Sequence, residues 1–134
     1  MTHTLDTKFH IDSWDEAPYE ELEDGRKLAR AHVQLSGPAD GLTSASFDAL
    51  LYYGPDGTSS YVSLMQAGGS IGGRTGSFVL QGRGTYDGTT ASGESVVIEG
   101  SGSGQLATLR GTSVSVSTHA DYPFMPFVLR YELG

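Results

Sequence analysis

Residues 56–88 read DGTSSYVSLMQAGGSIGGRTGSFVLQGRGTYDG, with a glycine-closed turn signal at each end and one in the middle. Asp56-Gly57, Gly72-Gly73 and Asp87-Gly88 supply the positive backbone φ angles that tight two-residue hairpin turns need. The segments between them are rich in Val, Thr, Tyr and Phe, which suit a pleated sheet. The stretch therefore predicts two long antiparallel strands joined by a tight hairpin.

The same turn signal recurs about every sixteen residues elsewhere, at Asp24-Gly25, Asp40-Gly41 and Ser103-Gly104. At this spacing a chain of 134 residues has room for about eight strands. We predict strands at residues 4–14, 27–37, 42–54, 58–70, 74–86, 90–99, 111–119 and 125–133.

Two connections carry weak helical signals. Residues 18–24 could hold one helical turn, and residues 103–111 predict a loop with one turn that buries Leu106 and Leu109. No segment has the length and periodicity of an amphipathic helix, so we expect helix below about 15%. Long strands without helical cover hide their edges by closing on themselves. The expected fold is all-β: an eight-stranded antiparallel up-and-down β-barrel, in a single domain over residues 1–134.

Alternating residues of a strand point to opposite faces, so parity predicts which side chains enter the lumen. Those predicted inside are Tyr53, Tyr61, Met65, Phe78 and Leu80. The outer face is not cleanly polar, since it would carry Val62 and Leu64. An oligomer that buries part of this wall is one explanation, and a long, partly polar lumen is the other. With no helix over the wall, we expect a homodimer or a larger homo-oligomer.

Charge and composition exclude several classes of function. A net charge of −8 and a pI near 4.7 disfavour binding to nucleic acids and to anionic membranes. The chain has no cysteine, which excludes disulfides, thiolate catalysis and cysteine-based zinc sites. The polar N-terminus is not a secretory signal, so we expect a cytoplasmic protein. We expect no cofactor, and no metal, because His3, His10, His32 and His119 lack metal-motif spacing.

Acidic residues concentrate near the N-terminus. Eight of the sixteen lie between Asp6 and Asp24, with only Lys8 among them. A solvated connection is one interpretation, and a cation-binding patch is the other, although the spacing of a calcium loop is missing.

Five segments resemble a family of small bacterial proteins. They are Phe9–Tyr19, Lys27–Ala31, Gly72–Gly82, Tyr86–Gly88 and Gly100–Gly111. They resemble a largely actinobacterial family of unknown function with an allene-oxide-cyclase-like barrel, and the resemblance covers nearly the whole chain. It implies an eight-stranded barrel that often self-associates, and it implies no assigned activity. The wider barrel superfamily includes cofactor-free cyclases.

The chain departs from that family at two positions. Typical members carry a carboxylate where Met65 stands and a histidine where Gly82 stands. Both positions share the predicted inward face, so their replacement implies a different or more apolar site.

Tyrosines are the candidate catalytic residues. Tyr53 and Tyr61 flank the Asp56-Gly57 turn and should lie close together across the hairpin. A tyrosine can polarise a carbonyl group in an apolar pocket, or it can only pack there. The candidate ligand-binding residues are Trp14, Met65, Arg74, Phe78, Leu80 and Gly82.

Other positions leave two interpretations open. Asp15 or Glu16 against Trp14 could have a raised pKa and act as an acid or base. The alternative is a strand-end turn with a packed Trp14, where the spacing of Ser13 and Glu16 also suits a capping box. Arg74 could bind a ligand carboxylate at the barrel mouth or form a surface ion pair. Asp48 and Glu94 would indicate a functional site only if they pointed inward.

The function suggested by these features is binding of a largely hydrophobic small molecule in the lumen. Within that class a cofactor-independent cyclase or isomerase of secondary metabolism is favoured, since holding a flexible substrate in a reactive conformation needs no catalytic motif. A lipocalin-like carrier without chemistry and a structural or interaction module with a filled lumen are the alternatives. Gly82→Trp is predicted to abolish ligand binding.

Overall fold

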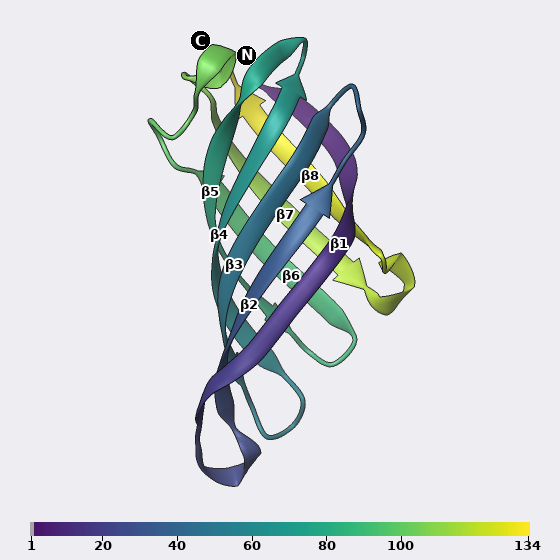
Figure 1. Cartoon of the computed structure of the whole chain (residues 1–134), viewed down its shortest axis with the longest axis vertical. Coiled ribbons are helices and arrows are strands. Elements are labelled where there is room, and N and C mark those ends of the chain that lie inside the picture. The colour runs from purple at the N-terminus through teal and green to yellow at the C-terminus, as the bar shows by residue number, and fades with distance from the viewer. Residues whose placement is uncertain (1) are drawn as a thin grey trace.

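The computed structural model describes residues 2–134, except for the side chain of His119. Eight strands follow one another around a closed antiparallel barrel, and β8 returns to pair with β1 (Figure 1). The strands are β1 His3–Glu21, β2 Lys27–Ser36, β3 Leu42–Tyr53, β4 Ser59–Ile71, β5 Arg74–Tyr86, β6 Thr90–Val97, β7 Arg110–Thr118 and β8 Phe124–Glu132. Short 3₁₀ turns lie at η1 Glu23–Gly25, η2 Gly104–Leu106 and η3 His119–Asp121. The predicted all-β barrel is confirmed.

The hairpin between β4 and β5 has the predicted geometry. Gly72 and Gly73 have φ angles of 58° and 82°, a region in which a side chain would be strained. The turn fixes a continuous register that runs from Ile71 opposite Arg74 to Ser59 opposite Tyr86. In the loop before β7, Leu106 and Leu109 are buried, as predicted. Within residues 2–134 no helix is both long and apolar enough to cross a membrane.

Strand β1 is longer than predicted. It continues to Glu21, so most of the acidic segment is an exposed strand, and the predicted helical turn is reduced to η1. The capping-box interpretation of Ser13 and Glu16 is therefore wrong. Pro18 belongs to this strand because the far end of β1 pairs only with β2 among the described residues, leaving a free edge. A missing N–H on such an edge breaks no ladder hydrogen bond.

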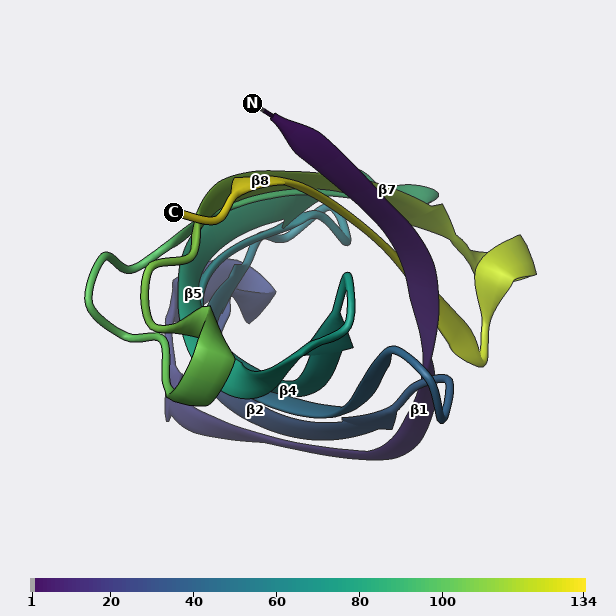
Figure 2. The same ribbon diagram turned by 90° about the horizontal axis from the view of Figure 1, so that it is seen from above.

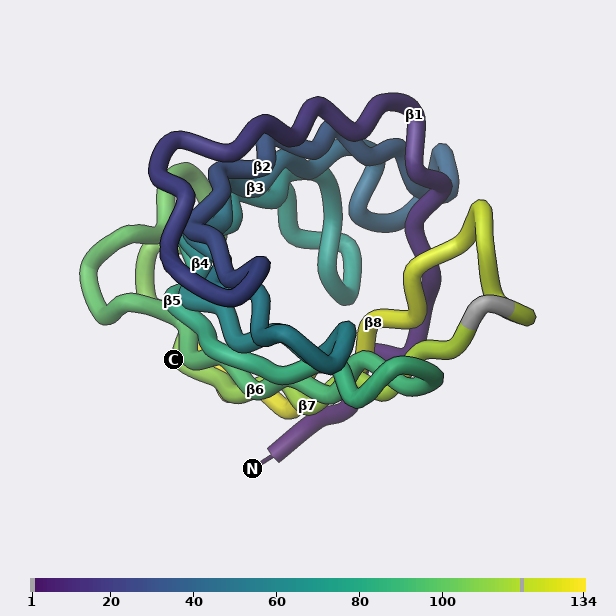
Figure 3. The backbone as a smooth tube through the Cα atoms, turned by 90° about the horizontal axis from the view of Figure 1, so that it is seen from below, coloured from purple at the N-terminus to yellow at the C-terminus, as the bar shows by residue number. Residues whose placement is uncertain are grey.

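The two ends of the barrel differ. One end holds both chain termini, the 37–41 and 72–73 turns and η2; we call it the terminal end (Figure 2). The other end holds the 22–26, 54–58, 87–89 and 119–123 connections; we call it the open end (Figure 3).

A packed core fills the lumen toward the terminal end. Its fully buried members include Phe9, Leu42, Ile71, Phe78, Leu106, Leu109 and Leu129. The rings of Phe9 and Phe127 lie against each other there, with centroids 5.5 Å apart. This core blocks the terminal end, and the loop that carries η2 covers it.

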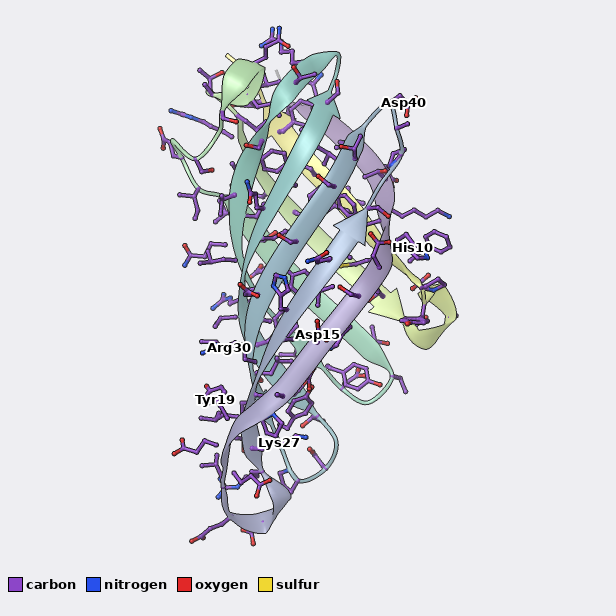
Figure 4. All side chains as sticks on the ribbon, in the orientation of Figure 1. His10, Asp15, Tyr19, Lys27, Arg30 and Asp40 are labelled. Atoms are coloured by element: carbon purple, nitrogen blue, oxygen red, sulfur yellow. The ribbon has the colours of Figure 1, made fainter. Side chains whose placement is uncertain are left out.

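The outer wall carries apolar side chains, as the strand parity predicted. Val62 and Leu64 are each 55% exposed on β4, and Val114 and Val116 are exposed on β7. Some of their cross-strand partners are charged: Val62 pairs with Arg83, Leu64 with Asp48 and Val114 with Glu94. Elsewhere on the outer wall, Figure 4 shows Asp15 and Arg30, on β1 and β2. The homo-oligomer that this wall suggested stays a prediction.

Candidate ligand-binding cavity

A cavity of about 440 Å³ lies between the packed core and the open end of the barrel. Met65 and Leu80, which are direct cross-strand partners, separate it from the core. Phe47, Ala49 and Leu51 line it along β3. Its volume lies within the range of about 300–1,000 Å³ that is typical of small-molecule pockets.

The predicted inward face is confirmed. Tyr53, Tyr61, Met65, Phe78 and Leu80 are buried or half-buried inside the barrel. The residues of the predicted site that line the cavity are Trp14, Tyr53, Tyr61, Met65, Leu80 and Gly82. Tyr61 pairs with Leu51, and Ser59 pairs with Tyr53, so the two tyrosines are diagonal neighbours across the hairpin.

Two predicted ligand contacts lie elsewhere. Phe78 is fully buried in the packed core and is not on the cavity wall. Arg74 is exposed beside the Gly72-Gly73 turn, at the terminal end and away from the cavity. Parity assigned Phe78 to the inside but carried no information on its depth along the barrel axis.

A polar cluster stands at the rim of the cavity. Glu16 accepts a hydrogen bond from the Trp14 indole at 3.1 Å and another from the Tyr53 hydroxyl at 2.5 Å. The Lys27 ammonium lies 4.9 Å from the centre of the Tyr53 ring, and Figure 4 places Lys27 toward the open end. Both side chains that donate to Glu16 are therefore committed to the protein rather than free to bind a ligand.

A β-bulge at Asp12 turns Trp14 and Glu16 toward the rim of the cavity, where both stay partly exposed to solvent. The register between β1 and β2 shifts between Ile11 and Ser13, which changes the parity of the residues that follow, up to a second shift between Pro18 and Glu20. Ile11 and Trp14 therefore both line the cavity. Hydrogen bonds from His10 and Ser36 hold the pKa of Asp12 below its usual range. Sequence parity missed Glu16 as a cavity-rim residue because no simple pattern marks the bulge.

Tyr61 has a different environment. Its ring packs over two glycines, and a Cβ at Gly93 would lie 2.6 Å from its hydroxyl oxygen. Gly84, the cross-strand partner of both, would be equally obstructed. Within residues 2–134 the Tyr61 hydroxyl has no hydrogen-bond partner, and burial raises its pKa. It stays protonated at neutral pH as a free donor on the cavity wall.

Gly82 lines the cavity, but neighbouring atoms of β6 already crowd the position that a side chain at residue 82 would take. A Cβ there would lie 2.9 Å from the backbone oxygen of Glu94 and 2.9 Å from the Cβ of Ser95. At Gly76, the backbone of Ser103 and the side chain of Leu106 already occupy the space that a Cβ would need. Gly82→Trp would therefore distort the wall itself, and it is not a clean test of ligand binding.

Asp48 and Glu94, the two acidic residues within strands, point outward. Asp48 is exposed and 2.6 Å from Nδ1 of His32. Glu94 is paired with Arg83 at 3.0 Å, with both side chains mostly exposed. Among the described residues, no group of three or more acidic or histidine side chains could hold a metal ion; the His119 side chain lies outside them.

The cavity tyrosines give a testable pH response. Burial raises the pKa of Tyr53, as do its hydrogen bond to Glu16 and the charge of that carboxylate; burial alone raises that of Tyr61. We expect both to ionise later than exposed tyrosines, which titrate near pH ~10. Since the folded-state pKa values exceed the unfolded ones, the stabilisation is full below about pH 10 and is lost as the pH rises through the folded values.

Ultraviolet titration of tyrosinate, with the urea-unfolded chain as reference, checks this expectation. Tyr61→Phe and Tyr53→Phe should each remove one late-titrating group. Simultaneous ionisation of all the tyrosines would contradict it.

These observations define the class: a small antiparallel β-barrel with one blocked end and an internal cavity toward the other. The chain matches, over residues 5–128, the family model described as "Protein of unknown function (DUF3224)", and it belongs to that family. A solved structure of a DUF3224 protein of unknown function from Shewanella oneidensis MR-1 is similar, with a TM-score of 0.78 and 24% sequence identity. The similarity covers 100% of this chain and 98% of that one.

No curated protein matches the chain. The resemblance to a bacterial family of unknown function is thus confirmed. The largely actinobacterial distribution and the likeness to allene oxide cyclase stay predictions.

Proposed function

We propose that this protein binds a largely hydrophobic small molecule in its cavity. The observation that carries the proposal is the cavity of about 440 Å³, which is lined mainly by aliphatic and aromatic side chains. A barrel of eight strands can fill its lumen with side chains or hold one small ligand. Here the core fills only the lumen toward the terminal end, which favours a ligand over a filled structural module.

A cyclase or isomerase that needs no cofactor is the catalytic form of this proposal. Tyr61 supports it, because a protonated hydroxyl without a protein partner can donate to a carbonyl oxygen that gains negative charge. Tyr53 is a weaker candidate, since its proton already bonds Glu16. The walls would supply the remaining effect by holding the substrate in one reactive conformation.

A carrier without chemistry is the second candidate. One observation favours it: both carboxylates near the cavity are already paired, Glu16 with Trp14 and Tyr53, and Glu94 with Arg83. A free general base is therefore missing from the described part of the wall.

Titration with N-phenyl-1-naphthylamine, a neutral and apolar fluorophore, tests binding in either form. We expect saturable binding at one site per chain, with enhanced and blue-shifted emission. Trp14 is the single tryptophan and lies on the cavity wall, so its emission should be quenched in parallel. An emission increase that does not saturate, with no change at Trp14, would refute the proposal and favour the filled structural module.

A further inference from the structure

Strand β7 has the usual alternation of inward apolar and outward polar residues reversed. Ser113 and Ser115 point into the barrel, while Val114 and Val116 between them are 65% and 56% exposed. Ser95 on β6 is the cross-strand partner of Ser113 and also lines the cavity. A strand of a filled barrel would place its valines inside, so this wall is built to present hydroxyl groups to the cavity.

The hydroxyl groups on this wall lack protein partners. Within residues 2–134 the side chains of Ser95, Ser113 and Ser115 form no hydrogen bond. Ser113 is only 4% exposed, yet no unpaired side-chain oxygen in the described chain is sealed from solvent. Its hydroxyl therefore opens into the cavity. A ligand that displaced water from these groups without replacing its hydrogen bonds would lose affinity.

The wall opposite β7 is apolar. Strand β3 stands four strands away from β7 in the order of the barrel, and it contributes Phe47, Ala49 and Leu51. Phe127 and Met125 of β8 extend the apolar surface. The cavity thus carries hydroxyl groups along β6 and β7, with Ser59 and Ser63 on β4, and it carries hydrocarbon mainly on β3 and on β8, the strand beside β7.

Charge is missing from the interior. Arg83 and Glu94, the charged residues that the described cavity wall includes, neutralise each other on the outer side. At the rim the Glu16 carboxylate and the Lys27 ammonium both lie beside Tyr53, so the rim offers an entering anion no net positive charge. A buried ionic group of a ligand would therefore have no counter-charge, which is costly.

The geometry points to a neutral, elongated ligand with several carbonyl or hydroxyl oxygens along one edge and hydrocarbon along the other. Its oxygens would face Ser95, Ser113, Ser115 and the free Tyr61 hydroxyl, and its apolar edge would lie on β3. This inference rests on the proposed function, because it names the class of molecule that the same cavity takes.

Three tricyclic probes of matched shape test the inference by quenching of Trp14 emission. Anthracene offers only hydrocarbon, 1,8-dihydroxyanthrone carries three oxygens along one edge, and anthracene-9-carboxylate carries a negative charge. We expect the intact protein, kept under argon, to bind the anthrone about tenfold or more tightly than anthracene, the gain from one or two hydrogen bonds. The carboxylate should bind more weakly than anthracene.

The double variant Ser113→Ala/Ser115→Ala removes two of the hydroxyl groups and adds no bulk. Its affinity for the anthrone should fall about tenfold, and its affinity for anthracene should not fall. The matched control Ser60→Ala/Ser92→Ala makes the same change on the outer wall, where both serines are exposed. It should bind like the wild type.

The outcomes separate the two proposals. Equal affinity of the wild type for anthracene and the anthrone, or preference for the carboxylate, would overturn the inference and leave hydrophobic binding intact. Loss of anthrone binding in the outer-wall control alone would also overturn it. Failure of all three probes and of the neutral fluorophore to bind would overturn the proposed function itself.

Discussion

Ser115→Trp is expected to abolish binding of N-phenyl-1-naphthylamine, and Val116→Trp is expected to leave it unchanged. The two residues are adjacent on β7 but point to opposite faces, so each variant adds the same indole to the same strand. At position 115 the indole enters the cavity and occupies the space of a ligand. At position 116 it points into solvent from a side chain that is already 56% exposed.

The size of the effect follows from competition for space. A ligand that loses its contacts with β3 would lose about 3 kcal/mol or more, which corresponds to about a hundredfold in affinity. Melting curves on both variants provide the control, because overpacking alone costs about 1–3 kcal/mol of folding free energy. If Ser115→Trp bound the fluorophore normally, or Val116→Trp lost binding, the site would be on the outer wall instead.

This pair replaces Gly82→Trp as the test of the lumen. The sequence favoured Gly82→Trp because glycine has no side chain and position 82 shares the inward parity of Leu80. The neighbouring strand β6 approaches closely there, so the missing side chain serves backbone packing rather than ligand volume. A sequence cannot distinguish these two uses of a glycine, since both need only the absence of a Cβ.

Most of the fold was predictable because local rules decide it. Glycine turns set where strands β2 to β5 begin and end, and a meander of that kind has few alternatives to a barrel. The exception was β1, where the Asp12 bulge changed the parity and a free edge tolerated Pro18. Both features depend on neighbouring strands that the local sequence does not specify.

The site was predictable in part. Parity correctly directed Tyr61, Met65 and Leu80 inward, since the register of β4 and β5 follows from their hairpin. The serines of β7 were missed because alternation normally assigns valines to the inside, and here they lie outside. The signal was present as Ser-Val-Ser-Val-Ser over residues 113–117, but only the barrel shows which face is enclosed.

Phe78→Ala is expected to have the opposite effect to Ser115→Trp: large on stability and small on binding. Phe78 is 0% exposed in the core at the terminal end, and it does not line the cavity. Removing a buried phenyl ring typically costs about 3–5 kcal/mol, a large part of the 5–15 kcal/mol that stabilises an ordinary domain. For a chain of 134 residues this corresponds to a fall in Tm of about 10–20 °C.

Thermal melting followed by circular dichroism measures the effect on stability, and fluorophore titration well below the variant's Tm measures binding. Val62→Ala, on the exposed face of β4, is the control and should change stability by less than about 0.5 kcal/mol. Phe78→Leu serves if the alanine variant does not fold. If folded Phe78 variants lost the fluorophore while their Tm stayed near that of the wild type, Phe78 would be a ligand contact, as the sequence predicted. Retained binding with a large fall in Tm would instead show that the packed core and the cavity have separate roles. Phe78→Ala would then change stability alone, while Ser115→Trp would change ligand binding.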